Sequence, residues 1–301
     1  MALDFVCIGA QKAGTTWLYD QLRQLDAFAV TPIKELHYFD RDPGYLSPNY
    51  VAITRFRDRL RDPKWYERVG RDIARTIRDK GSLEDFRFLW HWHRMNYSDS
   101  AYAGLFDKWE AGKIKGEITP SYSILQKQDI ERIYQTNSQV KIIFLLRDPI
   151  DRAWSHCRYF KPDVTYSIES MIEFIDGDDS SFRGDYLSTI DKYTSVFPKN
   201  QILLAYYDGL VADPQGLLSQ IVSFLGGDDV DSLVLNTLSK RSNASRRLEI
   251  PEQVYQHLLA KHERQIKTLA GDYGSYAANW LAEHYGGTAI AEPEVLTFHP
   301  K

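Results

Sequence analysis

The chain has few cysteines, and this scarcity excludes one class of fold. Its 301 residues include two, Cys7 in a short apolar segment near the N-terminus and Cys157 shortly after an Arg-Asp-Pro motif. Folds that depend on disulfide bonds carry a dense and regular cysteine pattern. A disulfide framework is therefore excluded, and we expect a reducing compartment.

The chain also lacks a long apolar run. No stretch of about 18 apolar residues occurs, so the sequence predicts no membrane span. It opens with Met-Ala-Leu-Asp and has neither the basic nor the apolar region of a secretory signal. We expect a cytoplasmic location, and a catalytic domain cut from an anchored enzyme would begin in the same way.

An excess of positive charge is absent too. Lys and Arg total 37 against 41 Asp and Glu, which gives a formal net charge of −4. This balance gives no overall attraction to nucleic acid, so we expect no nucleic-acid partner, and any anion site must be local. Hydrophobic residues at 43% and charged residues at 26% are typical of globular proteins. We expect one domain over residues 1–301, and no pattern indicates an oligomeric state.

Three apolar, β-prone segments indicate strands of a buried parallel sheet. They are residues 5–8, 141–146 and 201–207. Apolar residues at helical spacing follow the first segment from Thr15 and the third from Pro214, with a predicted helix end at Gly226. Because strands that alternate with helices are typical of parallel sheets, we predict an α/β fold with a central parallel sheet flanked by helices.

Residues 41–110 are predicted to form a largely helical insertion, rich in Arg, Asp, Trp and Tyr. The alternating charges from Arg55 to Arg78 are most simply a solvated helix face. His91 and His93 could suggest a metal site, but no third ligand follows at a recognisable spacing. We therefore predict no bound metal.

The segment between the first strand and the first helix has the composition of a phosphate-binding loop. From Gly9 to Thr16 it reads Gly-Ala-Gln-Lys-Ala-Gly-Thr-Thr. Amides at the start of a helix can hold an anion, but a nucleoside-triphosphate loop has Lys directly after its second Gly. Here Thr15 takes that position and the lysine is Lys12, which favours one 5′ phosphate carrying a transferable group over a metal-bridged pair. The alternative is a plain strand-to-helix turn with Thr as the helix cap.

A second anion motif follows the second strand. Arg147 lies at its carboxyl end, where ligands bind in parallel α/β folds, and Ser155 falls about two turns into the next helix. A forked arginine contact and a hydroxyl could together hold a phosphate. The alternative is an ion pair of Arg147 with Asp148. Two phosphate sites on neighbouring strand ends would suit a nucleotide with separate 5′ and 3′ phosphates.

These motifs resemble those of sulfotransferases that use 3′-phosphoadenosine-5′-phosphosulfate (PAPS), in particular the heparan-sulfate-type and bacterial branches. The loop at Lys12 resembles the family's 5′-phosphosulfate loop, and Arg147 with Ser155 resembles its 3′-phosphate pair. Residues 34–40, Lys-Glu-Leu-His-Tyr-Phe-Asp, are similar to the segment with the acceptor-activating carboxylate. Residues 116–122, Gly-Glu-Ile-Thr-Pro-Ser-Tyr, and residues 207–226 resemble two further family segments. The resemblance implies a P-loop-like nucleotide-binding fold.

Two segments depart from the family pattern. Ile118 stands where relatives that act on glycans usually carry a lysine, which weakens the case for a polysulfated glycan acceptor. Residues 242–247, Ser-Asn-Ala-Ser-Arg-Arg, occupy the place of a late 3′-phosphate loop but lack its Lys-Gly-Arg pattern. Arg246 and Arg247 are assigned to the 3′ phosphate on position alone; the alternative is surface charge.

The resemblance implies roles for the site residues. Lys12 is expected at the leaving phosphate oxygen and the sulfuryl group. Glu35 is expected to be the general base, unless it is only a surface partner of Lys34. His37, which would point to the same side in an extended segment, is an alternative base, an orienting partner or a buried histidine satisfied by backbone. The residues expected to bind PAPS are Lys12, Ala13, Gly14, Thr15, Thr16, Arg147, Ser155, Arg246 and Arg247.

The sequence therefore predicts a sulfotransferase. It would move a sulfuryl group from PAPS to a hydroxyl or amine of a glycan or small-molecule acceptor and release adenosine-3′,5′-bisphosphate. One alternative is a P-loop ATP-dependent phosphotransferase, which would need the missing Gly-Lys-Ser/Thr sequence. The other is an inactive nucleotide-fold binding protein, which would have lost Lys12, Glu35 or Arg147.

Overall fold

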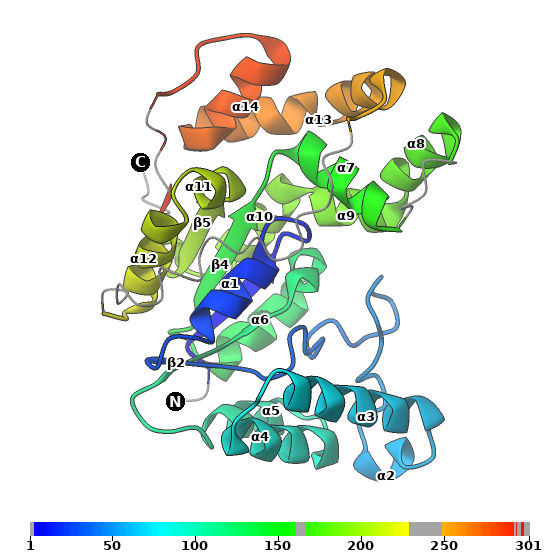
Figure 1. The fold of residues 1–301 in the computed structure, drawn as a ribbon, viewed down its shortest axis with the longest axis vertical. Coiled ribbons are helices and arrows are strands. Elements are labelled where there is room, and N and C mark those ends of the chain that lie inside the picture. The colour runs from blue at the N-terminus through cyan, green and yellow to red at the C-terminus, as the bar shows by residue number, and fades with distance from the viewer. Residues whose placement is uncertain (1–2, 161–165, 229–248, 292, 294–295, 298–301) are drawn as a thin grey trace.

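The structure is a computed structural model that describes residues 3–160, 166–228, 249–291, 293 and 296–297. Its centre is a sheet of six strands in the order β2-β3-β1-β4-β5-β6 (Figure 1). β1 to β5 pair in parallel and β6 runs antiparallel to β5. The predicted α/β fold with a central parallel sheet is confirmed. The strands are β1 (Phe5–Gly9), β2 (Phe28–Val30), β3 (Ile114–Ile118), β4 (Lys141–Leu146), β5 (Ile202–Tyr206) and β6 (Leu296–Thr297).

The inner strands are buried on both faces, which explains their continuous apolar sequences. Every residue of β1 and β5 is buried, as are five of the six residues of β4. The predicted strand over residues 201–207 is slightly too long at both ends. Gln201 ends a short 3₁₀ turn, and Tyr207 already begins the next helix, with Asp208 in its first turn where a negative charge is favourable.

Helices surround the sheet and extend beyond it at both ends of the molecule (Figure 1). α13 and α14 lie at one end and α2 to α5 at the other. No helix in the described part of the chain is long and apolar enough to cross a bilayer. The helices are α1 (Thr15–Leu22), α2 (Phe56–Arg59), α3 (Pro63–Arg78), α4 (Leu83–Arg94), α5 (Asp99–Phe106), α6 (Lys127–Thr136), α7 (Pro149–Phe160), α8 (Ile168–Asp176), α9 (Asp178–Gly184), α10 (Tyr186–Thr194), α11 (Tyr207–Ala212), α12 (Pro214–Leu225), α13 (Glu252–Tyr273) and α14 (Ser275–Tyr285), with 3₁₀ turns η1 (Pro120–Ile124) and η2 (Lys199–Gln201).

Residues 41–110 hold α2 to α5, and their helix starts follow local sequence signals. Asp62 caps α3, with Pro63 at its first position, and Ser82 with Asp85 forms a capping box at α4. The sequence had suggested a solvated helix face for the charged residues from Arg55 to Arg78, but Arg59, Arg68 and Asp72 are buried. Arg59 is buried and donates to the backbone carbonyls of Ile53, Thr54, His93 and Met95. Charged groups therefore tie this region together internally.

The parallel pairing of β1 with β3 places Phe5 opposite Gly116 and leaves no room for a side chain there. A Cβ there would lie 2.2 Å from the Phe5 ring, whereas one at Gly104 in α5 would meet nothing within 4 Å. We predict that Gly116→Ala destabilises the fold by about 1–3 kcal/mol through overpacking. The matched control, Gly104→Ala, should be neutral or stabilise by up to about 1 kcal/mol because alanine favours a helix. Urea unfolding of both variants checks this, and equal effects would contradict it.

Candidate active site

The loop between β1 and α1 presents helix amides without a side-chain cap. Gly14 precedes α1 with φ of 92°, and no side chain bonds to the helix start. Thr15 is the first helical residue, so the alternative of a threonine cap is not what the structure has. A Cβ at Gly14 would lie 3.1 Å from Leu210 and 3.3 Å from Tyr207, so a glycine is needed for close packing as well as for the backbone angle. The free amides form a site for an anion.

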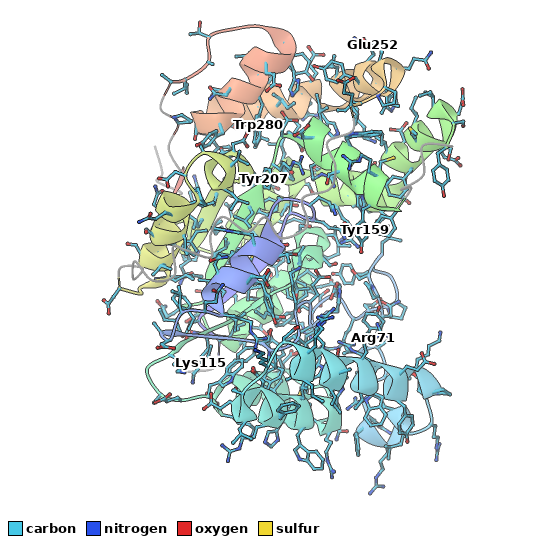
Figure 2. The ribbon with its side chains drawn as sticks, in the orientation of Figure 1. Arg71, Lys115, Tyr159, Tyr207, Glu252 and Trp280 are labelled. Atoms are coloured by element: carbon cyan, nitrogen blue, oxygen red, sulfur yellow. The ribbon has the colours of Figure 1, made fainter. Side chains whose placement is uncertain are left out.

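Lys12 projects from the same loop into a cationic environment. Its Nζ lies 4.2 Å from the centre of the Tyr159 ring, and no carboxylate of the described residues pairs with it. Burial lowers the pKa of Lys12, and the positive charges of Arg147, Arg158 and Lys34 lower it further. Figure 2 shows Tyr159 and Tyr207 on the two sides of the loop. The gathered positive charge favours a bound anion.

Arg147 joins this cluster from the end of β4. Its guanidinium lies 3.3 Å from the Lys12 carbonyl oxygen, to which it donates, and 4.7 Å above the Tyr207 ring. It also pairs with Asp151 at 3.1 Å, yet its buried Nε has no partner. An unpartnered donor beside an uncapped helix start is the arrangement that an anion would complete.

Arg147 does form the alternative Arg-Asp ion pair at the strand end, but with Asp151 and not with the adjacent Asp148. Asp148 instead accepts the amides of Ile150 and Asp151 at the start of α7, and its other oxygen lies 2.7 Å from His284 of α14. Ser155 lies one helical turn after Asp151, so it points to the side of α7 that Arg147 contacts. Arg246 and Arg247 lie outside the described residues.

Glu35, His37 and Asp40 form a series of charged contacts beyond β2. The two nearest side-chain atoms of Glu35 and His37 are 3.7 Å apart, and His37 Nδ1 lies 2.8 Å from an oxygen of Asp40. Lys34 Nζ donates to the other oxygen of Glu35 at 2.6 Å. The segment is not extended, because Glu35 and His37 have φ of 67° and 56°. His37 is buried but bonds to carboxylates rather than to backbone.

These contacts set the charge of each group. Burial disfavours the ionised Glu35 and the protonated His37, but their mutual contacts outweigh it. The contact with His37 and the hydrogen bond from Lys34 lower the pKa of Glu35 to about 2. Asp40 and Glu35 raise the pKa of His37 to about 9. At neutral pH the pair is therefore a carboxylate beside an imidazolium.

The structure brings most of the predicted site residues to one edge of the sheet, and it adds partners that the sequence did not reveal. Lys12, Glu35 and Arg147 follow three parallel strands, β1, β2 and β4, and Lys34 lies close enough to Lys12 to affect its pKa. The missed partners are Tyr159 and Arg158 at Lys12, Tyr207 at Arg147 and Asp40 at His37. Only Asp40 had a signal, since it ends the family-like segment that begins at Lys34.

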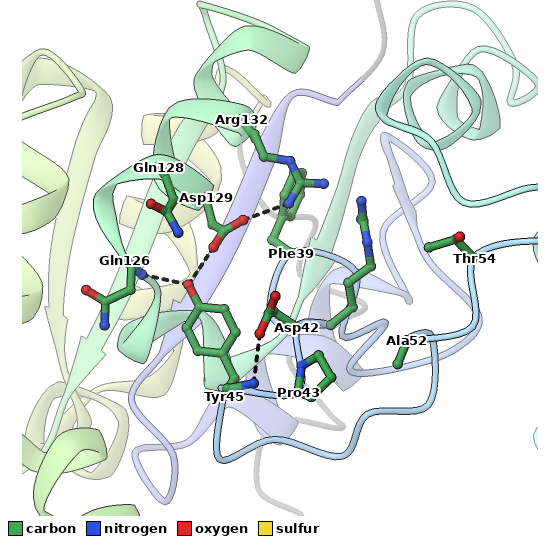
Figure 3. A pocket seen from close by; sticks show the side chains of 12 residues that line it. Phe39, Asp42, Pro43, Tyr45, Ala52, Thr54, Gln126, Gln128, Asp129 and Arg132 are labelled. Atoms are coloured by element: carbon green, nitrogen blue, oxygen red, sulfur yellow. Dashed lines mark hydrogen bonds and ion pairs between the residues drawn. The ribbon is translucent and has the colours of Figure 1, made fainter.

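A cavity of about 510 Å³ opens where this segment ends (Figure 3). Its charges are balanced: Arg41 and Arg132 against Asp42 and Asp129. Arg132 pairs with Asp129 at 2.7 Å, and Tyr45 donates to the same carboxylate at 2.6 Å. Amide and carboxylate groups around an aromatic ring could bind hydroxyl groups. The cavity is lined by Phe39, Arg41, Asp42, Pro43, Gly44, Tyr45, Ala52, Thr54, Gln126, Gln128, Asp129 and Arg132.

Comparison with protein families identifies the reaction class. The sequence model described as "Sulfotransferase domain" matches residues 3–274, which is most of the chain. The chain belongs to this family. Across the residues of this sulfotransferase domain that the structure describes, no three His, Cys, Asp or Glu side chains gather as they would around a metal ion.

Curated relatives match part of this sulfotransferase domain. Heparan sulfate glucosamine 3-O-sulfotransferase 3B1 of Mus musculus is 30% identical over 135 residues, 42% of this chain and 34% of the relative. Carbohydrate sulfotransferase 15 of Homo sapiens is 25% identical over 163 residues, 52% of this chain and 27% of the relative. The chain thus aligns with about a third or less of the length of these relatives.

Solved structures share the fold of this sulfotransferase domain over nearly its whole length. A sulfotransferase from Alicyclobacillus acidocaldarius has a TM-score of 0.57 and 20% identity, covering 90% of this chain and 95% of its own. Mouse sulfotransferase SULT7A1, complexed with PAP, has a TM-score of 0.52 and 14% identity, covering 93% and 89%. At these identities the likeness establishes the fold, and the predicted P-loop-like sulfotransferase architecture is confirmed.

The charge of His37 predicts a pH-dependent stability. Its pKa is raised in the folded state, so its contribution is complete below its unfolded pKa near 6.5 and is lost as pH rises through about 9. We expect His37→Gln to destabilise the protein by about 2 kcal/mol more at pH 6 than at pH 10. His257→Gln removes a more exposed ion pair with Asp176. Its effect on the free energy of unfolding should differ between the two pH values by less than about 0.5 kcal/mol. Urea unfolding at both pH values measures the difference, and a pH-independent effect of His37→Gln would contradict it.

Proposed function

We propose that this chain transfers a sulfuryl group from PAPS to a hydroxyl or amine of an acceptor and releases adenosine-3′,5′-bisphosphate. The observation that carries the proposal is the placement of Lys12, Arg147 and Glu35 after parallel strands of one sheet, at its carboxyl edge. Family membership supports this reaction class, and nothing in it favours the alternative of an ATP-dependent phosphotransferase.

The donor side of the site fits the two ends of PAPS. Lys12 lacks a carboxylate partner among the described residues, so in this proposal it contacts the sulfuryl group and the leaving phosphate oxygen. The backbone of Ala13 and Gly14 and the start of α1 at Thr15 and Thr16 hold the 5′ phosphate. The 3′ phosphate would satisfy the unpartnered Nε of Arg147, with the hydroxyl of Ser155 beside it.

PAPS supplies an activated sulfuryl group, and the chain's own residues handle the proton and the developing charge. Glu35 accepts the acceptor's proton while the new bond to sulfur forms and the bond from sulfur to the 5′ phosphate oxygen breaks. The electron pair of that bond remains on the phosphate oxygen, where Lys12 stabilises it. With a pKa near 2, Glu35 is ionised at neutral pH, and the protonated His37 orients it rather than acting as the base.

The cavity in Figure 3 is the proposed acceptor pocket. It follows the Glu35–Asp40 segment, and one of its two cations, Arg132, is already compensated by Asp99 and Asp129. Ile118 is fully buried and adds no charge. We therefore propose an acceptor with several hydroxyl groups and little negative charge, such as a neutral sugar, over a densely sulfated chain.

Donor binding is tested by calorimetry with adenosine-3′,5′-bisphosphate, with and without magnesium. We expect metal-independent binding that Arg147→Ala weakens about 10- to 100-fold, since a hydrogen bond to a charged group contributes about 1.5–3 kcal/mol. Lys12→Ala should weaken the binding of this product less than Arg147→Ala does, but it should lower the transfer rate about 100-fold or more. Arg264→Ala, an exposed cation on α13, is the matched control. Failure to bind, or a preference for ATP with magnesium, would refute the donor assignment.

The base is tested by transfer of ³⁵S from PAPS to methyl glucoside, N-desulfated heparan, heparan sulfate and p-nitrophenol. We expect Glu35→Gln to lower kcat about 100-fold or more, while the affinity for adenosine-3′,5′-bisphosphate stays within about twofold, because loss of a general base affects chemistry alone. Glu263→Gln, on the surface of α13, is the control. A Glu35→Gln variant with full kcat would rule out this base, and a preference for heparan sulfate would rule out the neutral acceptor.

A further inference from the structure

A fully buried carboxylate lies directly behind the segment that carries Glu35 and His37. Glu117, in β3, has no exposed surface and accepts hydrogen bonds from three hydroxyl groups. Thr119 Oγ1 donates at 3.0 Å, Tyr122 Oη at 3.1 Å and Tyr102 Oη at shorter range. All three donors are themselves buried. No residue of this group contacts the loop at Lys12 in any described interaction, so the donor site does not explain it.

Two of these hydroxyl groups hold the backbone of the base segment. The amide of Leu36 donates to Thr119 Oγ1 at 3.1 Å, and the amide of Tyr38 donates to Tyr122 Oη at 2.9 Å. The amide of Glu35 donates directly to the carbonyl of Ile118 at 3.1 Å. Three amides in a row of four residues are thus fixed to the end of β3 and the turn that follows it.

The segment needs this support because its backbone is strained. Glu35 and His37 both have left-handed φ, which costs about 1–2 kcal/mol for each residue with a side chain. Leu36 and Tyr38 alternate with these two strained positions, and their amides, together with that of Phe39, donate to the hydroxyls. The contacts therefore fix the two residues whose carboxylate and imidazole meet at 3.7 Å.

The carboxylate gives the hydroxyls a fixed direction. A hydroxyl has one proton, and above the pKa of Glu117 the ionised carboxylate can only accept. Thr119 and Tyr122 then donate to Glu117 and present lone pairs to the amides. An amide at position 117 would turn a donor toward one hydroxyl and disturb this order. Burial raises the pKa of Glu117 to about 7, although the three hydroxyl bonds oppose the rise. Glu117 is therefore an acidic residue at a position where burial of a carboxylate costs free energy.

We propose that Glu117 is a positioning residue for the catalytic base: through Thr119 and Tyr122 it holds the left-handed backbone that sets Glu35 against His37. This inference rests on the proposed role of Glu35. Tyr102 provides an internal control, because its hydroxyl bonds to the same oxygen of Glu117 as Tyr122 but contacts no amide of the base segment.

The first test needs neither donor nor acceptor. The proton titration of His37 is followed by NMR and assigned with His37→Gln. We expect Thr119→Val and Tyr122→Phe to lower the His37 pKa from about 9 by roughly 1, because an opposite charge at this distance contributes about that much. Thr119→Ser should restore it and Tyr102→Phe should leave it unchanged. Unchanged titration in both Thr119→Val and Tyr122→Phe, with thermal unfolding confirming folded protein, overturns the proposal.

The second test is the rate of ³⁵S transfer to the best acceptor of the panel. We expect Thr119→Val, Tyr122→Phe and Glu117→Gln to lower kcat about 10- to 100-fold, since misplacement of a base by about 1 Å costs this much, with unchanged affinity for adenosine-3′,5′-bisphosphate. Thr119→Ser and Tyr102→Phe should keep kcat within about threefold. If the kcat of Tyr102→Phe falls as far as that of Tyr122→Phe, Glu117 contributes only to packing and the proposal is wrong. If no variant or wild type transfers sulfur, the proposed function fails while the His37 titration still decides this inference.

Discussion

The parallel pairing of β1 with β3 on one side and β4 on the other is the constraint on which the site depends. Parallel strands bring their carboxyl ends to the same edge, so the loop after β1 and Arg147 after β4 meet there. β2 pairs with β3 in the same direction and delivers Glu35 to that edge. Residues far apart in the chain become neighbours through backbone hydrogen bonds alone.

The edge gathers positive charge that the fold neutralises only in part. Lys34 pairs with Glu35 and Arg147 with Asp151, whereas Lys12 has no carboxylate partner among the described residues. Around the loop, Lys12, Arg147, Arg158 and Lys34 are close enough for their charges to act on one another. Repulsion among these cations lowers the stability of the fold unless an anion binds, as is usual for a preorganised anion site. Beyond β2 the opposite holds, because His37 lies between two carboxylates and each partner stabilises the charge of the next.

The base segment shows how a strained conformation is supported from behind. Two left-handed residues are held by hydrogen bonds to the end of β3 and the η1 turn, and these bonds end on the buried Glu117. A buried acid with hydroxyl donors is less stable than apolar packing would be. The core of the fold carries this cost, whereas the positioned residue, Glu35, is partly exposed at the edge of the sheet.

The sequence by itself determined the fold class, the loop and the residues at the strand ends. Continuous apolar runs at β1, β4 and β5, with glycines and Pro149 or Pro214 at the helix starts, are local signals that burial and backbone geometry impose. The tertiary structure alone decided that Asp148 bonds to His284 of α14, that Tyr159 lies against Lys12 and that Glu35 and His37 are left-handed. These features arise from contacts between distant segments, and a pattern of neighbouring residues carries no record of such contacts.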